Sequence, residues 1–370
     1  MRSDIAGAGV SRRAFMAGVA GLAAAAAAPG ALGQAQNRTA PQVAGKHRID
    51  FHCHSMPPVM RAFLAANGSP DIMNSWNLSK HLEDMDKGGV GTSLLSIASP
   101  GVWHGRDVGL IRKVTREINE YNAKLTVDHP RTFGMFALLT LPDVEGSLRE
   151  AEYALDVLKA DGVGMRTPYG SLWHGEPIFE PLYQELNRRN AVVFTHPQDA
   201  PCCENLIPGV PSQSTIEYGT HTTRTITSLL ESRMAVRYPN IRWVFAHAGG
   251  TMPFLLSRIV GRKLPVGPDG LVMLDPGDQS RNNGQERLDT LRRFYYETAQ
   301  QTNVIALGAL RRVVPITQIV FGTDYPASDS GGRATPIADH AIGLAGVFSG
   351  NDLRAVESDN ALRLFPKYRS

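Results

Sequence analysis

Two histidines separated by one residue stand at the end of a short apolar run near residue 50. His52 and His54 flank Cys53 in the sequence Arg48-Ile49-Asp50-Phe51-His52-Cys53-His54. If this run is a β-strand, His52 and His54 lie on one face, because alternate side chains of a strand share a face. Two imidazoles at a strand end form half of a site for zinc or a similar ion. An isolated pair of this kind is more often structural, so the interpretation depends on ligands from elsewhere in the chain.

Three later strand-like runs also end in residues that can bind a metal or transfer a proton, namely His196, His247 and Asp324. The carboxyl ends of barrel strands meet on one face. Three imidazoles and one carboxylate suit a single divalent ion, Zn²⁺ with Mn²⁺ as the alternative. We therefore predict metal ligands at His52, His54, His196 and Asp324. His247 is the predicted catalytic acid–base group, with Asp324 beside it in catalysis. The reverse assignment, with His247 as ligand and His196 as proton carrier, stays open.

The remaining chain alternates short β-rich runs with helical patterns. Strands are predicted over residues 49–54, 92–98, 133–139, 162–166, 191–196, 241–247, 294–298 and 318–324. Helices are predicted over residues 78–87, 110–127, 145–158, 179–189, 222–237, 252–260, 305–312, 338–348, 352–356 and 360–365. Residues 55–76 are predicted to be a loop, and 198–221 and 261–290 to be long insertions. Eight such units predict an α/β protein with a (β/α)8 TIM barrel over residues 47–370. A doubly wound sheet is the competitor, but it requires a glycine-rich turn after its first strand.

Composition excludes several classes of protein. The chain has 370 residues, a formal net charge of +3, 20% charged and 42% hydrophobic residues, which is ordinary for a soluble globular protein. The basic excess is too small, and too scattered, to predict nucleic-acid binding. Three cysteines do not make a disulfide framework.

The first 46 residues are not predicted to belong to the fold. Ser11-Arg12-Arg13-Ala14-Phe15-Met16 precedes an alanine-rich apolar run over residues 17–28. A basic start, an apolar middle and a small-residue end are typical of a secretory signal. The paired arginines resemble a bacterial twin-arginine signal. We predict a signal peptide over residues 1–35 and a linker over 36–46. The twin-arginine export machinery would deliver the protein to the periplasm. After cleavage no stable membrane insertion is expected, because the apolar run is shorter than a membrane span.

Several motifs, taken together and in this order, resemble the amidohydrolase superfamily. They are similar in particular to its decarboxylase branch, which includes aminocarboxymuconate semialdehyde decarboxylase and 6-methylsalicylate decarboxylase. The resemblance covers roughly residues 47–366. The motifs are His52-Cys53-His54, Thr195-His196-Pro197, His247-Ala248-Gly249-Gly250, Gly322-Thr323-Asp324-Tyr325-Pro326, Thr222-Thr223-Arg224, Phe294-Tyr295-Tyr296-Glu297-Thr298-Ala299 and the closing Asn360-Ala361-Leu362-Arg363-Leu364-Phe365.

The resemblance implies a distorted barrel that holds one divalent metal through the four ligands above, with His247 as the catalytic histidine. Strand four ends in Arg166-Thr167 without the lysine that bridges two metals, which supports a mononuclear site. Glu297 stands where relatives often have aspartate, and the loop after strand one offers Arg61 near its start.

The implied activity is a metal-dependent carboxy-lyase that acts on a small aromatic or unsaturated carboxylic acid. Either protonation of the substrate carbon or attack by a hydroxide that His247 activates would release the carboxylate. A hydrolase of a lactone, amide or ester is the alternative, because the same ligands serve both reactions. A non-catalytic metal-binding or solute-binding protein is the third hypothesis. The sequence leaves the oligomeric state open, with a homodimer as one option.

Overall fold

The computed structural model describes residues 45, 47–67, 76–97, 107–204, 206–210, 212–326, 337 and 343–369. The chain divides into two units, Met1–Thr39 and Ala40–Ser370, and every described residue belongs to the second. The predicted signal peptide over 1–35 therefore lies outside the described residues. So does the predicted linker over 36–46, apart from Gly45. None of the described helices is long and apolar enough to cross a membrane.

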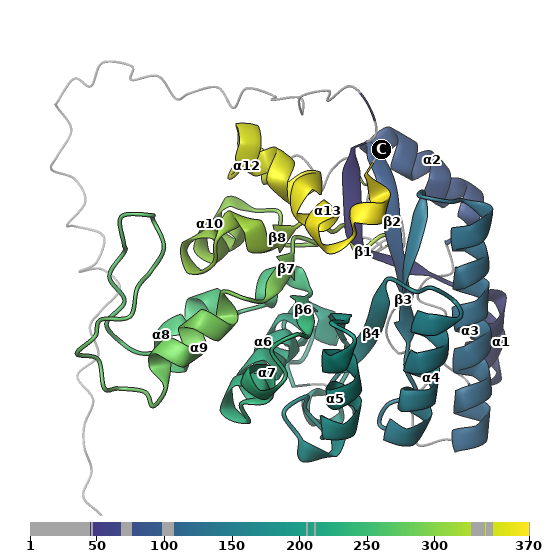
Figure 1. Cartoon of the computed structure of the whole chain (residues 1–370), viewed down its shortest axis with the longest axis horizontal. Coiled ribbons are helices and arrows are strands. Elements are labelled where there is room, and N and C mark those ends of the chain that lie inside the picture. The colour runs from purple at the N-terminus through teal and green to yellow at the C-terminus, as the bar shows by residue number, and fades with distance from the viewer. Residues whose placement is uncertain are drawn as a thin grey trace, which may run out of the picture. The chain divides into compact units, whose positions relative to one another are not determined.

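Eight strands follow one another in chain order around a barrel, and each pairs in parallel with the next (Figure 1). They are β1 (Arg48–Ser55), β2 (Val90–Ile97), β3 (Phe133–Leu138), β4 (Gly162–Thr167), β5 (Val192–Pro197), β6 (Arg242–Phe245), β7 (Tyr295–Glu297) and β8 (Ile319–Val320). The ring closes where the Phe51 N–H donates to the Phe321 carbonyl at 2.9 Å, and the His54 N–H to the Tyr325 carbonyl at 2.7 Å. The predicted (β/α)8 barrel is confirmed.

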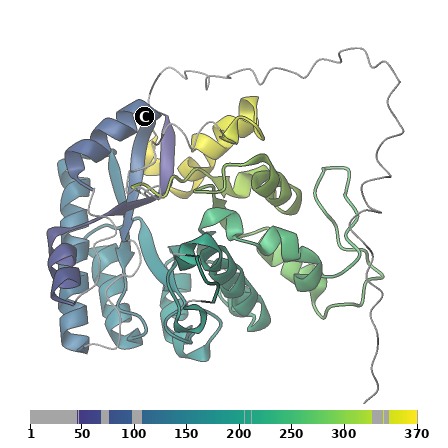
Figure 2. The same ribbon diagram turned by 180° about the vertical axis from the view of Figure 1, so that it is seen from behind.

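The helices lie outside the strands, as the front and back views show (Figures 1 and 2). They are α1 (Pro58–Ala66), α2 (Leu78–Gly88), α3 (Val108–Asp128), α4 (Val144–Asp156), α5 (Glu180–Arg188), α6 (Glu217–Glu231), α7 (Met234–Arg237), α8 (Leu256–Ile259), α9 (Gly284–Leu291), α10 (Val304–Val313), α12 (Gly350–Arg354) and α13 (Asn360–Leu364). Several of these helices begin after a capping residue whose side chain accepts a hydrogen bond from a backbone N–H of the first turn. These capping residues are Asn77, Asp107, Asp143 and Asn303.

Three helical predictions need correction. The predicted loop over 55–76 contains helix α1, because Pro58 occupies the first helical position, where its missing N–H has no helical partner to lose. The predicted helix over 222–237 begins earlier, at Glu217, and is divided into α6 and α7 at Arg233, which has a φ of +59°. The predicted insertion over 261–290 contains most of α9. Residues 338–342 of the helix predicted over 338–348 lie outside the described part.

A cluster of aromatic and aliphatic side chains fills the barrel interior. Phe51 packs against Phe136 and Phe365, with ring centroids 5.9 and 5.5 Å apart, and Phe136 packs against Phe194 at 5.4 Å. Phe365 follows α13, so the end of the chain helps to close this core. The buried members of this cluster are apolar. His52, His54 and His196 lie towards the carboxyl ends of β1 and β5.

Candidate metal centre at the carboxyl ends of the strands

The structure brings together all five residues that the sequence singled out. Asp324 Oδ1 lies 3.0 Å from His52 Nε2, 2.9 Å from His54 Nε2 and 3.8 Å from His196 Nε2. Its other oxygen, Oδ2, lies 3.4 Å from His247 Nε2. His52, His196, His247 and Asp324 each offer one ligand atom, and these atoms all lie within 4.8 Å of one another. His54 Nε2 joins them, at 3.0 Å from His52 Nε2. This cluster is suited to a divalent metal ion.

Two of the histidines have their ring orientation fixed by an acceptor on the outer side. His52 Nδ1 lies 2.8 Å from Glu297 Oε1, and His196 Nδ1 lies 2.6 Å from the Pro197 carbonyl oxygen. A carboxylate and a carbonyl can only accept, so each Nδ1 carries the proton. In the neutral imidazole the Nε2 lone pair is then free, and it faces Asp324. His196 Nε2 is buried and has no hydrogen-bond partner among the described residues.

The ring of His54 is also oriented by a hydrogen bond from its Nδ1, in this case to a hydroxyl group. His54 Nδ1 lies 2.9 Å from Ser96 Oγ, which itself donates to the Cys53 carbonyl at 3.0 Å. Because the hydroxyl proton is used in that bond, Nδ1 of His54 donates to Ser96. The three Nε2 lone pairs therefore converge on one point beside a carboxylate, an arrangement that a bound cation satisfies. Histidine ligands of metals are commonly held by such outer hydrogen bonds. The residues present thus fit a bound divalent ion.

His247 and Asp324 lie on turns rather than on the strands from which they were predicted. β6 ends at Phe245 and β8 at Val320, and both residues have left-handed backbones, with φ of +55° and +62°. Such a backbone ends the strand ladder and turns the side chain towards the barrel axis. Both side chains lie in the cluster, although the strand boundaries predicted for these two segments were wrong.

Asp50 fixes the turn that carries Asp324. Its Oδ1 accepts from the backbone N–H groups of His52 at 3.0 Å and of Thr323 at 3.1 Å. Its Oδ2 accepts from Thr323 Oγ1 at 2.6 Å. Burial raises the pKa of the Asp50 carboxyl to about 7. One carboxyl group thereby joins β1 to the segment after β8, and with it the first two histidines to Asp324.

The buried carboxylates of the cluster favour a positive charge beside them. Burial by itself lowers the pKa of His52, yet the carboxylates of Glu297 and Asp324 raise it to about 10. Burial lowers the pKa of His54 to about 4. Burial would raise the pKa of the Asp324 carboxyl, but the facing imidazoles hold it well below its usual range. Two buried carboxylates therefore act on a set of imidazoles, and a divalent ion would supply the compensating charge without a proton.

Sequence reasoning missed several residues that build the cluster. Glu297 is the last residue of β7, and its place near the end of the strand predicted over 294–298 was a signal that could have identified it as a partner of the metal site. Gln300 Nε2 donates to Asp324 Oδ2 at 2.5 Å from a residue with a φ of +55°. No sequence pattern identifies Ser96 or Asp50 as partners, because each acts through a contact across the barrel.

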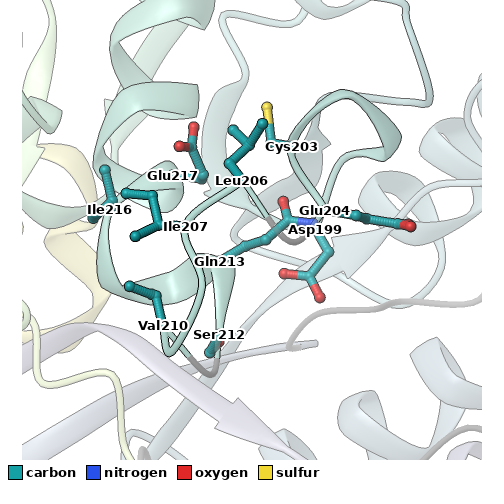
Figure 3. A pocket seen from close by; sticks show the side chains of 10 residues that line it. All are labelled: Asp199, Cys203, Glu204, Leu206, Ile207, Val210, Ser212, Gln213, Ile216 and Glu217. Carbon is teal, nitrogen blue, oxygen red and sulfur yellow. The ribbon is translucent and has the colours of Figure 1, made fainter.

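A separate cavity of about 310 Å³ lies in the segment between β5 and α6 (Figure 3). Its lining residues are Asp199, Cys203, Glu204, Leu206, Ile207, Val210, Ser212, Gln213, Ile216 and Glu217, none of which belongs to the metal cluster. Cys203 forms a disulfide with its neighbour Cys202. This pairing encloses no other residue and cross-links no elements.

Comparisons with known proteins agree with this geometry. The amidohydrolase family model matches residues 49–367. A 6-methylsalicylic acid decarboxylase from Aspergillus aculeatus is 34% identical over 337 residues, which covers 87% of this chain and 97% of the relative. A 6-methylsalicylic acid decarboxylase from Penicillium expansum is 32% identical over 336 residues, with 87% and 97% covered.

The solved structures extend the likeness of fold. A dihydroxybenzoic acid decarboxylase from a Polaromonas species, with bound manganese and an inhibitor, matches with a TM-score of 0.72 at 20% identity. The match covers 88% of this chain and 98% of that one. Together with the family model and the 34% identical relative, the (β/α)8 barrel with its histidine cluster shows that the chain belongs to the amidohydrolase family.

Proposed function

We propose that the protein is a metal-dependent carboxy-lyase that releases carbon dioxide from a small aromatic carboxylic acid. The observation that carries the proposal is the convergence of three Nε2 lone pairs on the Asp324 carboxylate at the carboxyl ends of the strands. The relatives named 6-methylsalicylic acid decarboxylases, at 34% and 32% identity over 87% of the chain, support the reaction and the aromatic substrate class.

We assign the metal ligands to His52, His54, His196 and Asp324, and proton transfer to His247. The three ligand histidines face Asp324 Oδ1, whereas His247 faces Oδ2. This difference in position supports separate roles. Zn²⁺ remains our choice of ion, and the manganese in the Polaromonas enzyme supports Mn²⁺ as the alternative. When bound, the ion would supply a Lewis acid that withdraws negative charge from the substrate oxygens.

The chain's own residues provide the proton and its position. Protonated His247 gives the proton on Nε2 to the ring carbon that bears the carboxylate. The bond from that carbon to the carboxylate then breaks, its electron pair returns to the ring, and neutral carbon dioxide leaves. His247 recovers a proton from solvent. Asp324 Oδ2, 3.4 Å from His247 Nε2, holds the imidazole in place.

The experiment is a substrate panel on protein reconstituted with Zn²⁺ or Mn²⁺. Hydroxybenzoates, including 6-methylsalicylate, are compared with lactones and esters by carbon dioxide release and by proton release. We expect carbon dioxide from a hydroxybenzoate. His247→Ala should keep the metal and lose about 10²- to 10⁴-fold in kcat, the usual contribution of general acid catalysis. Asp324→Ala should lose both the metal and the activity.

Each other outcome rejects a part of the proposal. Proton release from lactones without carbon dioxide identifies a hydrolase, and a firmly bound metal without any turnover identifies a binding protein. Full metal occupancy in Asp324→Ala removes Asp324 from the ligand set. Loss of metal in His247→Ala, with retention in His196→Ala, exchanges the roles of these two histidines.

For the N-terminal segment we propose a twin-arginine signal peptide over residues 1–35, a linker over 36–46 and delivery to the periplasm. The support is the pair Arg12-Arg13 before Phe15 and the short alanine-rich run after it.

A further inference from the structure

Arg166 is placed by its strand beside the metal cluster. It lies near the end of β4, and its Cα is paired in the parallel ladder with that of His196 on β5. Paired residues of neighbouring strands direct their side chains to the same face of the sheet. Arg166 and His196 also line the same small cavity, together with Ser96, the partner of His54. The Arg166 side chain is therefore on the metal side of the barrel wall.

The backbone of Arg166 is firmly held, but its charged head group is not. Its N–H donates to Tyr169 Oη at 2.8 Å, and its carbonyl accepts from His174 Nε2 at 2.8 Å. The residue is only 5% exposed. Nevertheless, its guanidinium makes no hydrogen bond and no ion pair with any residue that the structure describes. Buried arginines are almost always paired, because an unpaired buried charge has lost its hydration without compensation.

Two other arginines already have partners within the protein. Arg61 Nη2 donates to the Trp76 carbonyl at 2.8 Å. Arg224 Nη1 lies 3.7 Å from a Glu217 carboxylate oxygen. These two guanidinium groups are engaged by the protein itself. Arg166 differs from them in being both more deeply buried and unpaired.

The charge of Arg166 acts on the metal cluster. Burial lowers the pKa of its guanidinium only to about 10, so the group stays cationic at neutral pH. The Asp324 carboxylate of the cluster acts on this charge from a distance, without an ion pair between the two side chains. A cation in this position, which makes no hydrogen bond or ion pair with a carboxylate among the described residues, is suited to an anion that arrives with the substrate.

We propose that Arg166 binds the carboxylate of the aromatic acid substrate through parallel N–H donors. A guanidinium matches a carboxylate in this bidentate way, which fixes orientation as well as charge. The inference rests on the proposed function and adds to it the residue that recognises the acid. Loss of carbon dioxide removes the carboxylate, so the product no longer has a partner for Arg166 and its release is favoured.

The test measures binding separately from turnover. Salicylate and its neutral amide, salicylamide, are titrated by calorimetry into the metal-loaded wild type and into Arg166→Met and Arg166→Lys. We expect Arg166→Met to weaken salicylate binding roughly tenfold to a hundredfold, the usual effect of losing hydrogen bonds to a charged group. Salicylamide binding should not change, and Arg166→Lys should recover part of the loss. The exposed Arg149→Met is the matched control, with the same change of charge, and should bind both ligands as the wild type does.

A stability measurement distinguishes substrate recognition from a structural role. Arg166→Met removes an unpaired buried charge, so its Tm without ligand should equal or exceed that of the wild type. A lower Tm or a failure to fold would mean that the guanidinium supports the fold, and would overturn the proposal. Equal weakening of salicylate and salicylamide would overturn it as well.

The same experiments test the carboxy-lyase proposal and the carboxylate site at Arg166 separately. If Arg166 governs salicylate binding but no acid of the panel releases carbon dioxide, the carboxylate site stands and the carboxy-lyase proposal fails. If carbon dioxide is released and Arg166→Met keeps the wild-type KM, the carboxy-lyase stands and the carboxylate site fails. Because substrate binding is the step affected, KM should rise more than kcat falls.

Discussion

The carboxylate of Glu297 accepts hydrogen bonds from three separate stretches of chain. Oε1 accepts from His52 Nδ1 at 2.8 Å and from the His247 N–H at 2.5 Å, and Oε2 accepts from the Ala299 N–H at 2.6 Å. The side chain is fully buried. A single residue therefore sets the tautomer of one proposed metal ligand and the backbone position of the proposed proton donor.

Glu297→Gln should weaken metal binding about tenfold to a hundredfold, the usual effect of losing a group that orients a ligand. The glutamine amide has the shape of the glutamate carboxylate but carries no charge. Its NH₂ group would replace one of the two oxygens and would therefore face an N–H donor. Competition with a fluorescent chelator measures the affinity. Glu120→Gln, on the exposed side of α3, is the control. Unchanged affinity in Glu297→Gln would show that the proton on His52 Nδ1 needs no carboxylate.

At the scale of elements, Arg189 ties the end of α5 to the end of α4. Its Nη1 and Nη2 bind Asp156, the last residue of α4, at 2.6 and 2.8 Å, and its Nε binds Glu185 on α5 at 2.5 Å. Arg188 also binds Glu185, at 2.7 Å. These hydrogen bonds, first those from Arg188, lower the pKa of Glu185 to about 2. Two neighbouring helices of the outer layer are thus joined by charged groups.

The contribution of Glu185 to stability should disappear in acid. Its folded pKa of about 2 lies below the ordinary value of 4.5, so between these values the unfolded chain binds a proton that the folded chain does not. The contribution is therefore complete above pH 4.5 and is lost as the pH falls towards 2. We expect Glu185→Gln to be about 1 kcal/mol less stable at pH 7, with a gap that narrows by pH 3.

Urea unfolding of both proteins across this range checks the expectation. Glu83→Gln removes an exposed carboxylate that pairs with Lys87 within one helix, and serves as the control. A gap for Glu185→Gln that stays constant with pH would show that the ion pairs of Arg188 and Arg189 do not stabilise the fold.

At the scale of the whole molecule, the metal cluster exists only when the barrel has closed. Its residues come from β1, β5 and the turns after β6 and β8, and Asp50 joins the first of these to the last. An unfolded chain has no such site, so the metal is expected to bind the folded protein alone. Such a protein suits an export route that carries folded molecules, as the proposed twin-arginine signal would provide.

Exchanging both Arg12 and Arg13 for lysine should stop export. The full-length precursor should then remain in the cytoplasm with its signal uncleaved, because the paired arginines are the feature by which the signal is recognised. Cell fractionation and intact-mass measurement check both points. Arg38→Lys, in the proposed linker, should be exported normally. Normal periplasmic delivery of the doubly substituted chain would reject the twin-arginine proposal.

The sequence by itself was sufficient for the architecture. Eight strand-like runs alternate with helical patterns, and period-two spacing puts His52 and His54 on one face. Local pattern also explains the errors. The prediction of a loop over residues 55–76 is wrong at helix α1, which begins at Pro58, because proline at the first turn is compatible with a helix. The end of α6 depends on the left-handed Arg233, which no hydrophobic period reveals.

Only the tertiary structure decided which atoms of the site are free to act. His52 meets Glu297 across 245 residues, and His54 meets Asp324 across 270. Contacts of this kind depend on barrel closure and on the register of neighbouring strands, and local propensity carries no information about either. Closure of the barrel fixed the tautomers of His52, His54 and His196. It also placed His247 beside Oδ2, the second oxygen of the Asp324 carboxylate. Closure also left the guanidinium of the buried residue Arg166 without a hydrogen bond or ion pair to any residue that the structure describes.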